Sequence, residues 1–578
     1  MNEVANNPAL AAAKQAQTKV GECLEEGRSF RLEAGAGAGK TYSLVAALKQ
    51  IISDRGAELM QSGRKIACIT YTEVARDEIA REVERHPAIL VETIHAFSWG
   101  FLRQYQKALR ELVAGSEKRR DKLEEVGGVG SKVVEYDLGF FGVDDKRITL
   151  AHDDIPSYMA KLLAKPKFQL LFQQQFPVIF IDEYQDTDRD FMAAITEHYF
   201  TPKKGPLVGL FGDHWQTIYN SEYELAAYPV EAIDKGSNFR SASAIVDVLN
   251  RLRPELTQVV ADPKAEGEAR FFHTNLFMAE RTNTAHSKAD LFPELARTVR
   301  ESLMQRLAGE GWDLTKTKVL MLTHNVLAAE QGYPSIAKVF SGRNEAFARK
   351  EDPVIKFFAE TLEPMAEAYQ ASNYGELFRL YGGRPAIYKH ADKQAWRSDM
   401  DALMKLRDEG TVGCVLDHLQ TTKRPALPDR VLRREDYIRQ LAGESVPAEA
   451  TSLLRHQALR DVSYSEMASL VRFVEKQTPF ATQHSVKGSE FENVLVVLGG
   501  GWNHYNWPLL LELIETKALT AANKKGYYRA RNLFYVSISR PVKRLAVLAT
   551  QTLSDTALTT ATKLFGQANV EALSVLEH

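Results

Sequence analysis

The chain has 578 residues, of which 44% are hydrophobic, 26% charged and 9% aromatic; 73 basic and 75 acidic residues give a formal charge of −2. This length exceeds what one hydrophobic core supports and predicts three or four domains or subdomains. The near-neutral charge excludes a global field that would attract nucleic acid, so any nucleic-acid groove must be a local basic patch.

The cysteines and the hydrophobic runs indicate a cellular compartment. Cys23, Cys68 and Cys414 are isolated and lack CxxC spacing, which predicts free thiols in a reducing compartment, without a disulfide frame or a cysteine metal site. The first residues lack the basic and apolar segments of a secretion signal, and no apolar run reaches transmembrane length. We therefore expect a cytoplasmic protein that has no membrane contact.

The first predicted element is an alanine-rich helix over residues 5–25 that contains Gln15 and Gln17. A glutamine just before a phosphate-binding loop can act as donor and acceptor toward the edge of adenine. Either glutamine could make this contact, and we assign it to Gln17. An exposed helical glutamine is the alternative explanation for each.

A glycine-rich loop follows, between an apolar run at 30–32 and a helical pattern at 41–52. It consists of Ala34, Gly35, Ala36, Gly37, Ala38, Gly39, Lys40 and Thr41. Such a loop lines up backbone N–H groups around phosphate oxygens at the positive end of the helix dipole. The lysine reaches the β- and γ-phosphates and the threonine hydroxyl ligates Mg²⁺. The loop therefore predicts ATP and Mg²⁺ as cofactors; a flexible loop before an ordinary helix is the alternative.

The next segments continue the α/β pattern and then leave it. A strand over 65–70 leads into a helix that starts near Tyr71, and Thr93 to Phe97 precede an amphipathic helix over 98–113. From 115 to 170 a charge cluster at 117–122 and a glycine-rich joint precede mixed helical patterns. We interpret this stretch as an inserted helical subdomain.

Acidic residues follow two later strands, where each strand ends. The strand at 177–181 ends in Asp182 and Glu183, and the strand at 207–211 ends in the segment 212–219. The carboxyl ends of parallel strands are where ligands bind in α/β sheets. We assign Asp182 to the metal site and Glu183 as the base that polarises the attacking water, provided that both lie opposite the phosphate loop.

The second half repeats the α/β pattern. A helix over 243–252 follows Asn238 to Ser241, and strands at 269–272 and 319–322 flank a helix at 293–307. Residues 350–475 are almost wholly helical, which predicts a second insertion. The α/β pattern returns with the segment 482–491, a strand at 494–498, a helix at 531–539 that presents Arg540, and a last strand at 545–548.

Taken in order, these segments resemble the motifs of superfamily 1A DNA helicases of the UvrD/Rep/PcrA family. Residues 34–41, 70–79, 93–97, 182–187, 212–219, 238–241, 482–491 and 531–540 resemble motifs I, Ia, Ib, II, III, IV, V and VI, and 323–328 resembles a weaker intermediate motif. The resemblance extends from near the N-terminus to residue 540.

The resemblance implies an α/β fold with two RecA-like P-loop motor domains, each interrupted by a helical insertion. The expected division is domain 1A at 1–97 and 171–245, insertion 1B at 98–170, domain 2A at 246–350 and 476–578, and insertion 2B at 351–475. ATP is then expected in the cleft between the motor domains.

The resemblance also implies roles for individual residues. Besides Glu183, the catalytic candidates are Gln216 of motif III and the arginines Arg240 and Arg540, whose charge suits the γ-phosphate. Phe239 stands where the family usually has a tyrosine stacked on adenine, and Glu490 corresponds to the glutamate that contacts the ribose. The expected contacts to single-stranded DNA, by stacking and phosphate binding, are Tyr71, Thr72, His95 and Thr482.

Two departures from the family pattern stand out. After motif III the family commonly has Trp-Arg, with the tryptophan stacked on a base, whereas here Tyr219 is followed by Asn220 and Tyr223 is the candidate substitute. Motif VI ends in Ser539 before Arg540, and its usual second arginine is Asn532. The first departure concerns DNA stepping and leaves the hydrolysis site untouched.

The expected function is an ATP-dependent helicase or translocase that moves 3′ to 5′ on single-stranded DNA and acts on tailed duplexes, in DNA repair, recombination or anti-phage defence. Short members of the family include the helicase subunit of the Gabija anti-phage system, which works with a separate nuclease of the OLD family. The alternative is a regulatory DNA-sensing ATPase subunit that controls a partner nuclease and unwinds little. A P-loop kinase or GTPase does not explain the second half with Glu490 and Arg540.

Overall fold

In the computed structural model, the chain is described over most of its length. The described residues are 7–136, 141–200, 205–218, 228–284, 287–321, 327–328, 331–340, 347, 350, 352–382, 387–440, 451–475, 479–482, 486–500 and 505–573. The chain divides by its contacts into two compact units. Unit 1 contains Met1–Arg270, Leu509–Leu545 and Asp555–Val570; unit 2 contains Phe271–Pro508, Ala546–Ser554 and Glu571–His578.

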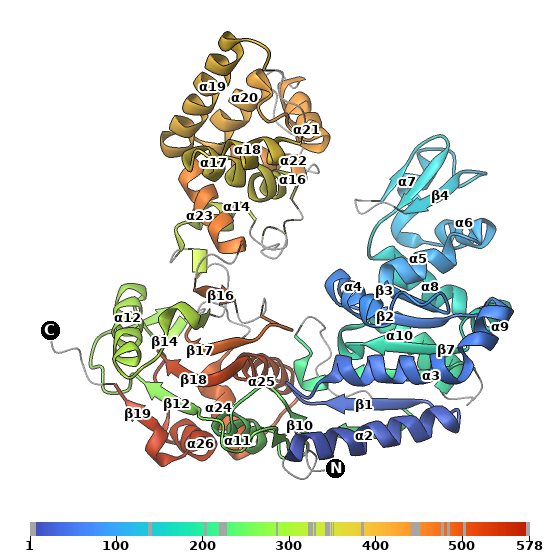
Figure 1. The fold of residues 1–578 in the computed structure, drawn as a ribbon, viewed down its shortest axis with the longest axis vertical. Coiled ribbons are helices and arrows are strands. Elements are labelled where there is room, and N and C mark those ends of the chain that lie inside the picture. The colour runs from blue at the N-terminus through green and yellow to red at the C-terminus, as the bar shows by residue number, and fades with distance from the viewer. Residues whose placement is uncertain are drawn as a thin grey trace. The chain divides into compact units, whose positions relative to one another are not determined.

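Unit 1 is built around a six-stranded parallel sheet with the strand order β3-β2-β7-β8-β1-β9 (Figure 1). The strands are β1 (Phe30–Ala34), β2 (Ile66–Thr70), β3 (Ile89–Thr93), β7 (Val178–Asp182), β8 (Leu207–Gly212) and β9 (Glu231–Lys235). Every residue of β2 and β7 is buried, as expected for parallel strands covered on both faces. The strands at 65–70, 177–181 and 207–211 are thereby confirmed; β9 was not expected.

The helices of unit 1 include the two that flank the phosphate loop in sequence. The helices are α2 (Pro8–Glu25), α3 (Lys40–Ser62), α4 (Glu73–Glu82), α5 (Ile94–Leu102), α6 (Gln106–Ala114), α10 (Arg189–Ile195), α11 (Ser243–Leu252), α25 (Lys524–Ile538) and α26 (Asp555–Phe565), with α24 (Trp507–Thr516) beginning in unit 2. Asn7 caps α2 by accepting from the Leu10 N–H, and Pro8 opens it, a favoured first helical residue.

The expected single helix over 98–113 is two helices, α5 and α6, separated at residues 103–105. Phe101, near the end of α5, packs against Tyr105, the last residue of the break, with ring centroids 5.2 Å apart. Tyr105 also meets Phe168, and Phe101 meets Phe172. This cluster of four aromatic rings, of which the three phenylalanines are buried, favours the turn of the chain over a continuous helix.

The first insertion is not purely helical, contrary to the expectation. It holds α7 (Arg120–Glu124), α8 (Asp154–Leu163) and α9 (Pro166–Gln175), and also a three-stranded sheet with the order β4-β6-β5, made of Val133–Tyr136, Arg147–Leu150 and Gly142–Val143. The β-branched Val134 and Ile148 are paired in this sheet and buried. Short runs of β-branched residues favour strands over helices, which explains the difference.

Most residues of a second six-stranded sheet, with the order β16-β15-β17-β18-β12-β19, belong to unit 2. Its strands are β12 (Glu268–His273), β15 (Thr317–Met321), β16 (Phe480–Thr482), β17 (Phe491–Leu498), β18 (Pro541–Ala549) and β19 (Val570–Ala572). The strand expected at 545–548 is therefore β18 and is not the last. Unit 2 also contains α12 (Pro293–Gly309) and the hairpin of β13 (Arg281–Thr284) and β14 (Ser287–Leu291).

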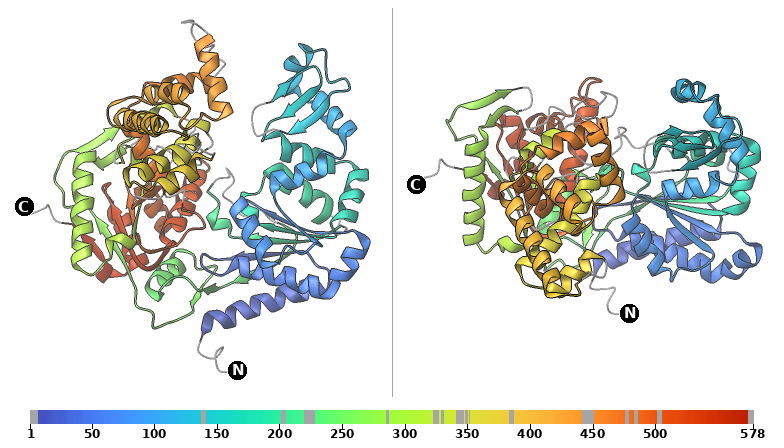
Figure 2. Two further views of the ribbon diagram at one scale, coloured as in Figure 1. Left: turned by 45° about the horizontal axis from the view of Figure 1, so that its top comes forward. Right: turned by 90° about the horizontal axis from the view of Figure 1, so that it is seen from above.

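The second insertion is helical in its described residues, as expected. Its longer helices are α17 (Glu363–Gln370), α18 (Tyr374–Tyr381), α19 (His390–Glu409), α20 (Val412–Thr422), α21 (Asp429–Gln440), α22 (Thr451–Arg460) and α23 (Tyr464–Val474). Figure 2 shows these helices, coloured yellow to orange, packed together as a bundle. Their core includes Leu403, Leu416 and Leu470, each of which is at most 1% exposed to solvent.

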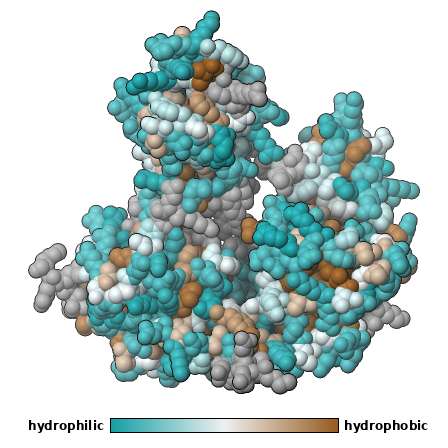
Figure 3. All heavy atoms as spheres, in the orientation of Figure 1, coloured by the Kyte–Doolittle hydropathy of each residue, from teal (hydrophilic) through white to brown (hydrophobic). Residues whose placement is uncertain are grey.

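No described helix is long and apolar enough to cross a bilayer. On the face shown in Figure 3, hydrophilic residues predominate among the coloured ones, and hydrophobic residues form only small groups.

Candidate nucleotide-binding site

The parallel pairing of unit 1 gathers the candidate residues at the carboxyl edge of its sheet. In the strand register Asp182 lies opposite Phe211, Glu33 opposite Gly212 and Ala34 opposite Lys235. The phosphate loop leaves β1 at this edge, and the segments around Glu183 and Gln216 leave β7 and β8 there. The structure thus brings motifs I, II and III together, as the sequence analysis required.

The glycines of the phosphate loop have conformations and neighbours that exclude larger side chains. Gly37 and Gly39 have φ angles of 73° and 71°, in the left-handed region. A Cβ atom at Gly35 would lie 2.6 Å from Gln258 Nε2, and one at Gly37 would lie 2.8 Å from Arg240 Cβ. By contrast Ala34, where the general pattern has glycine, is the last residue of β1 and is buried without such a conflict.

Lys40 begins α3 and contacts both acidic residues of motif II. Its Nζ lies 3.4 Å from Asp182 Oδ1 and forms an ion pair with Glu183 Oε1. Glu183 has a φ of 50°, a conformation that non-glycine residues adopt at a cost and that often occurs at functional sites. Gln185 Nε2 donates to Glu183 Oε2 at 2.5 Å and holds the carboxylate in place.

Asp182 is suited to a metal ion that arrives with a nucleotide. The residue is 4% exposed, and burial raises the pKa of its carboxyl group while the charge of Lys40 acts in the opposite direction. Its Oδ1 is buried and meets the Lys40 ammonium at 3.4 Å. A buried carboxylate that faces the phosphate-loop lysine suits an Mg²⁺ bound to the nucleotide, and Thr41 on the first turn of α3 would supply a hydroxyl ligand.

The three remaining catalytic candidates also meet within unit 1. Arg540 Nη2 donates to Gln216 Oε1 at 3.2 Å, and Arg240 Nη1 donates to the Ser539 carbonyl at 3.2 Å. Arg540 is 1% exposed; burial, and then the charge of Arg240, lower its pKa to about 9, so it remains a cation at neutral pH. The motif VI helix α25 belongs by its contacts to the same unit as the phosphate loop.

The departure at Asn532 has a structural role. Its Nδ2 donates to the Thr217 carbonyl at 3.1 Å, and its Oδ1 accepts from Arg531. The Arg531 guanidinium carbon lies 3.7 Å from the centre of the Trp215 ring. The residue that replaces the family's second arginine therefore ties α25 to motif III.

The residues expected to bind the adenosine part of ATP do not all belong to unit 1. Phe239 is 42% exposed, and its N–H donates to the Gly37 carbonyl at 2.9 Å, so this ring borders the phosphate loop. In α2 the Gln17 Oε1 is buried and accepts no hydrogen bond from a described residue. Glu490 is exposed and, like Thr482 of β16, belongs to unit 2; the roles of these two residues remain predictions.

Several predicted positions lie outside the described residues. They are Tyr219 and Tyr223 after motif III, residues 323–326 of the intermediate motif, residues 483–485 of motif V and the side chain of Thr482. The substitution of Tyr223 for the missing tryptophan therefore remains a prediction.

Three DNA-contact candidates lie at the same edge of the sheet: Tyr71 and Thr72 after β2, and His95 after β3. Thr72 Oγ1 accepts from the Ala75 N–H at 3.2 Å and caps α4. The His95 ring stacks on His152 with centroids 3.5 Å apart and 14° between the planes. Burial, and then the neighbouring His152, lower the His95 pKa to about 4, so His95 is neutral at pH 7. A phosphate contact by His95 would therefore use a hydrogen bond without a charge.

Sequence reasoning missed Lys235, which lies behind the phosphate loop. Its Nζ donates to the Gly39 carbonyl and to Ser43 Oγ, both at 2.8 Å, and no described carboxylate pairs with it. Burial lowers its pKa to about 8. Alternation along β9 places Ile233 and Lys235 on the buried face, a signal that was available once β9 was recognised as a strand.

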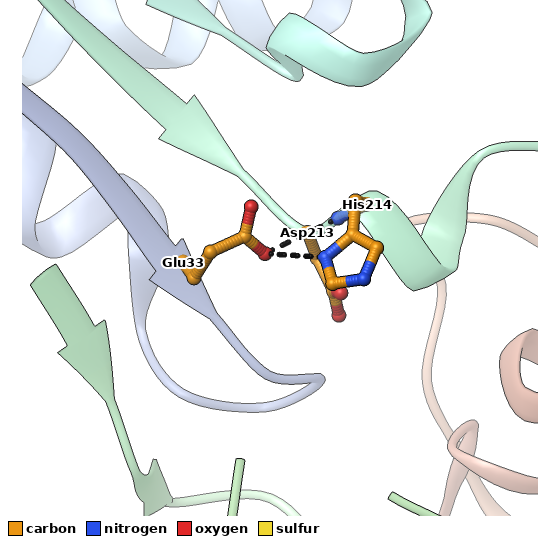
Figure 4. A group of neighbouring side chains, drawn as sticks. All are labelled: Glu33, Asp213 and His214. Carbon is orange, nitrogen blue, oxygen red and sulfur yellow. Dashed lines mark hydrogen bonds and ion pairs between the residues drawn. The ribbon is translucent and has the colours of Figure 1, made fainter. Parts of the chain in front are cut away.

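Sequence reasoning also missed a buried cluster of Glu33, Asp213 and His214 beside the loop (Figure 4). Glu33 lies near the end of β1 and accepts from both the backbone N–H and Nδ1 of His214, at 3.3 and 3.1 Å. Burial alone would raise the pKa of Glu33, but the contacts to His214 and Tyr184 and the charge of Arg253 outweigh it and lower the pKa to about 2.

Comparisons with known proteins agree with this geometry. Residues 18–222 match the family described as an AAA domain. The chain is 23% identical to the Gabija protein GajB of Bacillus cereus (strain HuB5-5), over 92% of this chain and 94% of GajB.

A solved structure, the arterivirus nonstructural protein 10 helicase, is 10% identical with a TM-score of 0.26; the alignment spans 93% of this chain and 61% of that one. The AAA-domain match and the similarity to GajB agree with the motif order: the chain is similar to helicase-type P-loop ATPases, and its α/β fold is consistent with RecA-like motor domains.

Proposed function

We propose that the chain is an ATP-driven motor that moves 3′ to 5′ along single-stranded DNA and unwinds tailed duplexes. The observation that carries the proposal is the convergence of Lys40, Glu183 and Arg540 with their partners at one edge of one sheet. Phosphoryl transfer depends on positioning and on charge stabilisation, and these residues supply both. The division into domains 1A, 1B, 2A and 2B is part of the proposal.

Each residue has a proposed role in the hydrolysis of ATP. Lys40 and the loop N–H groups bind the phosphates; Thr41 and Asp182 hold Mg²⁺, which supplies charge neutralisation on the phosphates. Glu183 takes the proton of the attacking water. Its ion pair with Lys40 holds the Glu183 carboxylate next to the phosphate-binding end of the loop. The remaining catalytic residues, Gln216, Arg240 and Arg540, stabilise negative charge on the γ-phosphate.

The remaining contacts follow the family pattern. Phe239 and Gln17 bind adenine, and Glu490 binds the ribose. Tyr71, Thr72, His95 and Thr482 bind single-stranded DNA, where stacking contributes roughly 1–3 kcal/mol per base without regard to sequence. The biological setting is DNA repair, recombination or anti-phage defence, and the similarity to a Gabija protein favours defence.

A second candidate function shares the active site but differs in output. It is a DNA-sensing ATPase subunit, acting in the cytoplasm, that controls a separate nuclease and unwinds little. The formal charge of −2 and the missing tryptophan after motif III favour it, because both weaken contacts to the DNA strand.

The test is ATP hydrolysis by the wild type and Lys40→Ala with no nucleic acid, single-stranded DNA, duplex DNA or RNA. Stimulation by single-stranded DNA that is absent in Lys40→Ala supports the motor. Hydrolysis indifferent to every nucleic acid contradicts the motor and favours the regulatory subunit. Strand displacement on duplexes with either a 3′ or a 5′ tail then tests the direction, and displacement only from the 5′ tail would contradict 3′-to-5′ movement.

A further inference from the structure

The cluster of Glu33, Asp213 and His214 has the composition of a metal site, but a guanidinium group already occupies the cation's place. Arg253 Nη1 donates to Asp213 Oδ1 at 2.6 Å, and its Nη2 approaches Glu33 Oε2 at 3.5 Å. Arg253 is 2% exposed and follows α11 directly as its C-cap residue. A metal ion would have to displace this arginine from both carboxylates, so the cluster is an arginine site.

From Arg253 a chain of hydrogen bonds leads to the candidate catalytic groups. The second oxygen of Asp213, Oδ2, accepts from Gln216 Nε2 at 2.8 Å. Because that contact takes the amide nitrogen of Gln216, its oxygen faces the other way and accepts from Arg540 Nη2 at 3.2 Å. The orientation of the Gln216 side chain therefore depends on where Asp213 is held.

Arg253 also contacts the group that anchors the phosphate loop. Its Nη1 lies 3.4 Å from the Tyr535 hydroxyl oxygen, which accepts from the Ala36 N–H at 3.2 Å. The guanidinium carbon lies 5.6 Å from the centre of the Tyr535 ring and 5.3 Å from that of Trp215. One buried side chain thus touches motif III and the motif VI helix, and through Tyr535 the phosphate loop.

The chemistry of arginine suits this position. Its planar fork presents several donors in fixed directions and stays charged when buried, whereas lysine offers a single point charge. The neighbouring carboxylates raise the Arg253 pKa despite its burial. A buried arginine between two carboxylates can be purely structural. The contact of Asp213 with Gln216 is what links this arginine to the candidate catalytic groups.

We propose that Arg253 is a positioning residue for ATP hydrolysis, which fixes Asp213 and thereby presents Gln216 to Arg540. This inference rests on the proposed ATPase function and adds a residue outside the motifs to it. Arg253 touches no reacting atom, so its effect must pass through Gln216.

A double-mutant cycle between Arg253 and Gln216 tests this. Arg253→Lys, Gln216→Ala and the double variant are compared with wild type for kcat, for the KM of ATP and for binding of a fluorescent ADP analogue. We expect Arg253→Lys to lower kcat about tenfold and to change nucleotide affinity less than about threefold, since it removes the fork and keeps the charge. In the Gln216→Ala background, Arg253→Lys should lower kcat no further.

Two additional variants keep the test decisive. Arg251→Lys on the same helix is the matched control, because Arg251 is exposed and donates to the Leu564 carbonyl away from the cluster; it should leave kcat unchanged. Asp213→Asn preserves the shape of the side chain and loosens the contact to Arg253. We expect it to lower kcat as Arg253→Lys does, again with no further effect in Gln216→Ala. If Arg253→Lys does not fold, the Asp213→Asn cycle decides.

Several results would overturn the inference. One is a double variant whose kcat falls by the product of the two single effects, because that would show that Arg253 acts independently of Gln216. Another is a fall in kcat matched by an equal loss of ADP binding, which would indicate general damage to the site. If wild type does not hydrolyse ATP at all, the proposed function fails and takes this inference with it; an active wild type with multiplicative effects removes the inference alone.

Discussion

Unit 1 and the helical bundle of unit 2 each contain buried ion pairs, and their surroundings differ. In the bundle, Arg407 binds Glu363 through two donors at 2.9 and 2.6 Å, and the Tyr464 hydroxyl donates to the same carboxylate at 2.7 Å. This network joins three helices, and among the described residues its carboxylate contacts no candidate catalytic group. In unit 1, Arg253 binds Asp213 at a strand end, and the other carboxylate oxygen of Asp213 accepts a hydrogen bond from Gln216.

The comparison shows that a buried ion pair is weak evidence of function by itself. Desolvation of both charges offsets much of their attraction, so such pairs often serve mainly to specify the packing. Position decides between the two roles. Ligands bind at the carboxyl edge of a parallel sheet, where strand ends and backbone N–H groups can contact them. Side chains in the interior of a helical bundle contact only other side chains of the bundle.

The largest effect is expected from Arg540→Ala in unit 1. Nucleotide binding should remain largely intact and turnover should fall by about 10²-fold or more, because the arginine acts mainly on charge that develops in the transition state. Steady-state hydrolysis and binding of an ADP analogue measure the two quantities. Loss of binding with unchanged turnover per bound nucleotide would contradict the assignment of Arg540.

The opposite behaviour is expected from Glu363→Ala in the bundle. Removing the carboxylate leaves the largely buried Arg407 without its partner, which should lower the free energy of unfolding of the bundle by about 3–5 kcal/mol. Hydrolysis of ATP without DNA, measured below the unfolding transition, should stay near the wild-type rate. Urea denaturation gives the stability, and a large loss of hydrolysis by folded protein would show that this network also serves the active site.

A smaller effect is expected from Lys235→Met and concerns the dependence of stability on pH. The Lys235 pKa is about 8 in the folded chain and higher when unfolded, so between these values the unfolded state binds more protons and wild-type stability rises with pH. Lys235 should contribute up to about 1.4 kcal/mol per pH unit to this rise, and Lys235→Met should remove that contribution. Urea denaturation from pH 8 to 10 measures it; equal slopes for both proteins would contradict the prediction.

An effect of similar size is expected from His95→Gln, at acidic pH. Because the folded pKa of about 4 lies below the ordinary value of 6.5, the unfolded state binds the proton first as the pH falls. His95 therefore destabilises the fold progressively from pH 6.5 down toward 4, and His95→Gln should show a weaker loss over this range. Thermal unfolding at several pH values measures the difference. His152→Gln is the companion variant, since it removes the other ring of the stack.

The order of local elements could be predicted from the sequence because it depends on neighbouring residues. The strands ending at Ala34 and Asp182, the loop of glycines and the helix beginning at Ser243 follow from apolar runs, turn residues and helical periodicity. The identity of the phosphate loop followed for the same reason, since Gly37, Gly39 and Lys40 lie within a few residues of one another.

What the sequence could not predict is which distant residues share an environment. Arg253 and Lys235 carry no motif, and their roles arise only because the folded sheet and the helix α25 bring Asp213, Gly39 and Tyr535 beside them. The same holds for the sheet in the first insertion and for the break after α5, where aromatic packing overrides a continuous helical pattern. Motif residues can be recognised in the sequence because their roles depend on the neighbouring backbone. The roles of buried charged residues depend on tertiary contacts, which exist only in the folded chain.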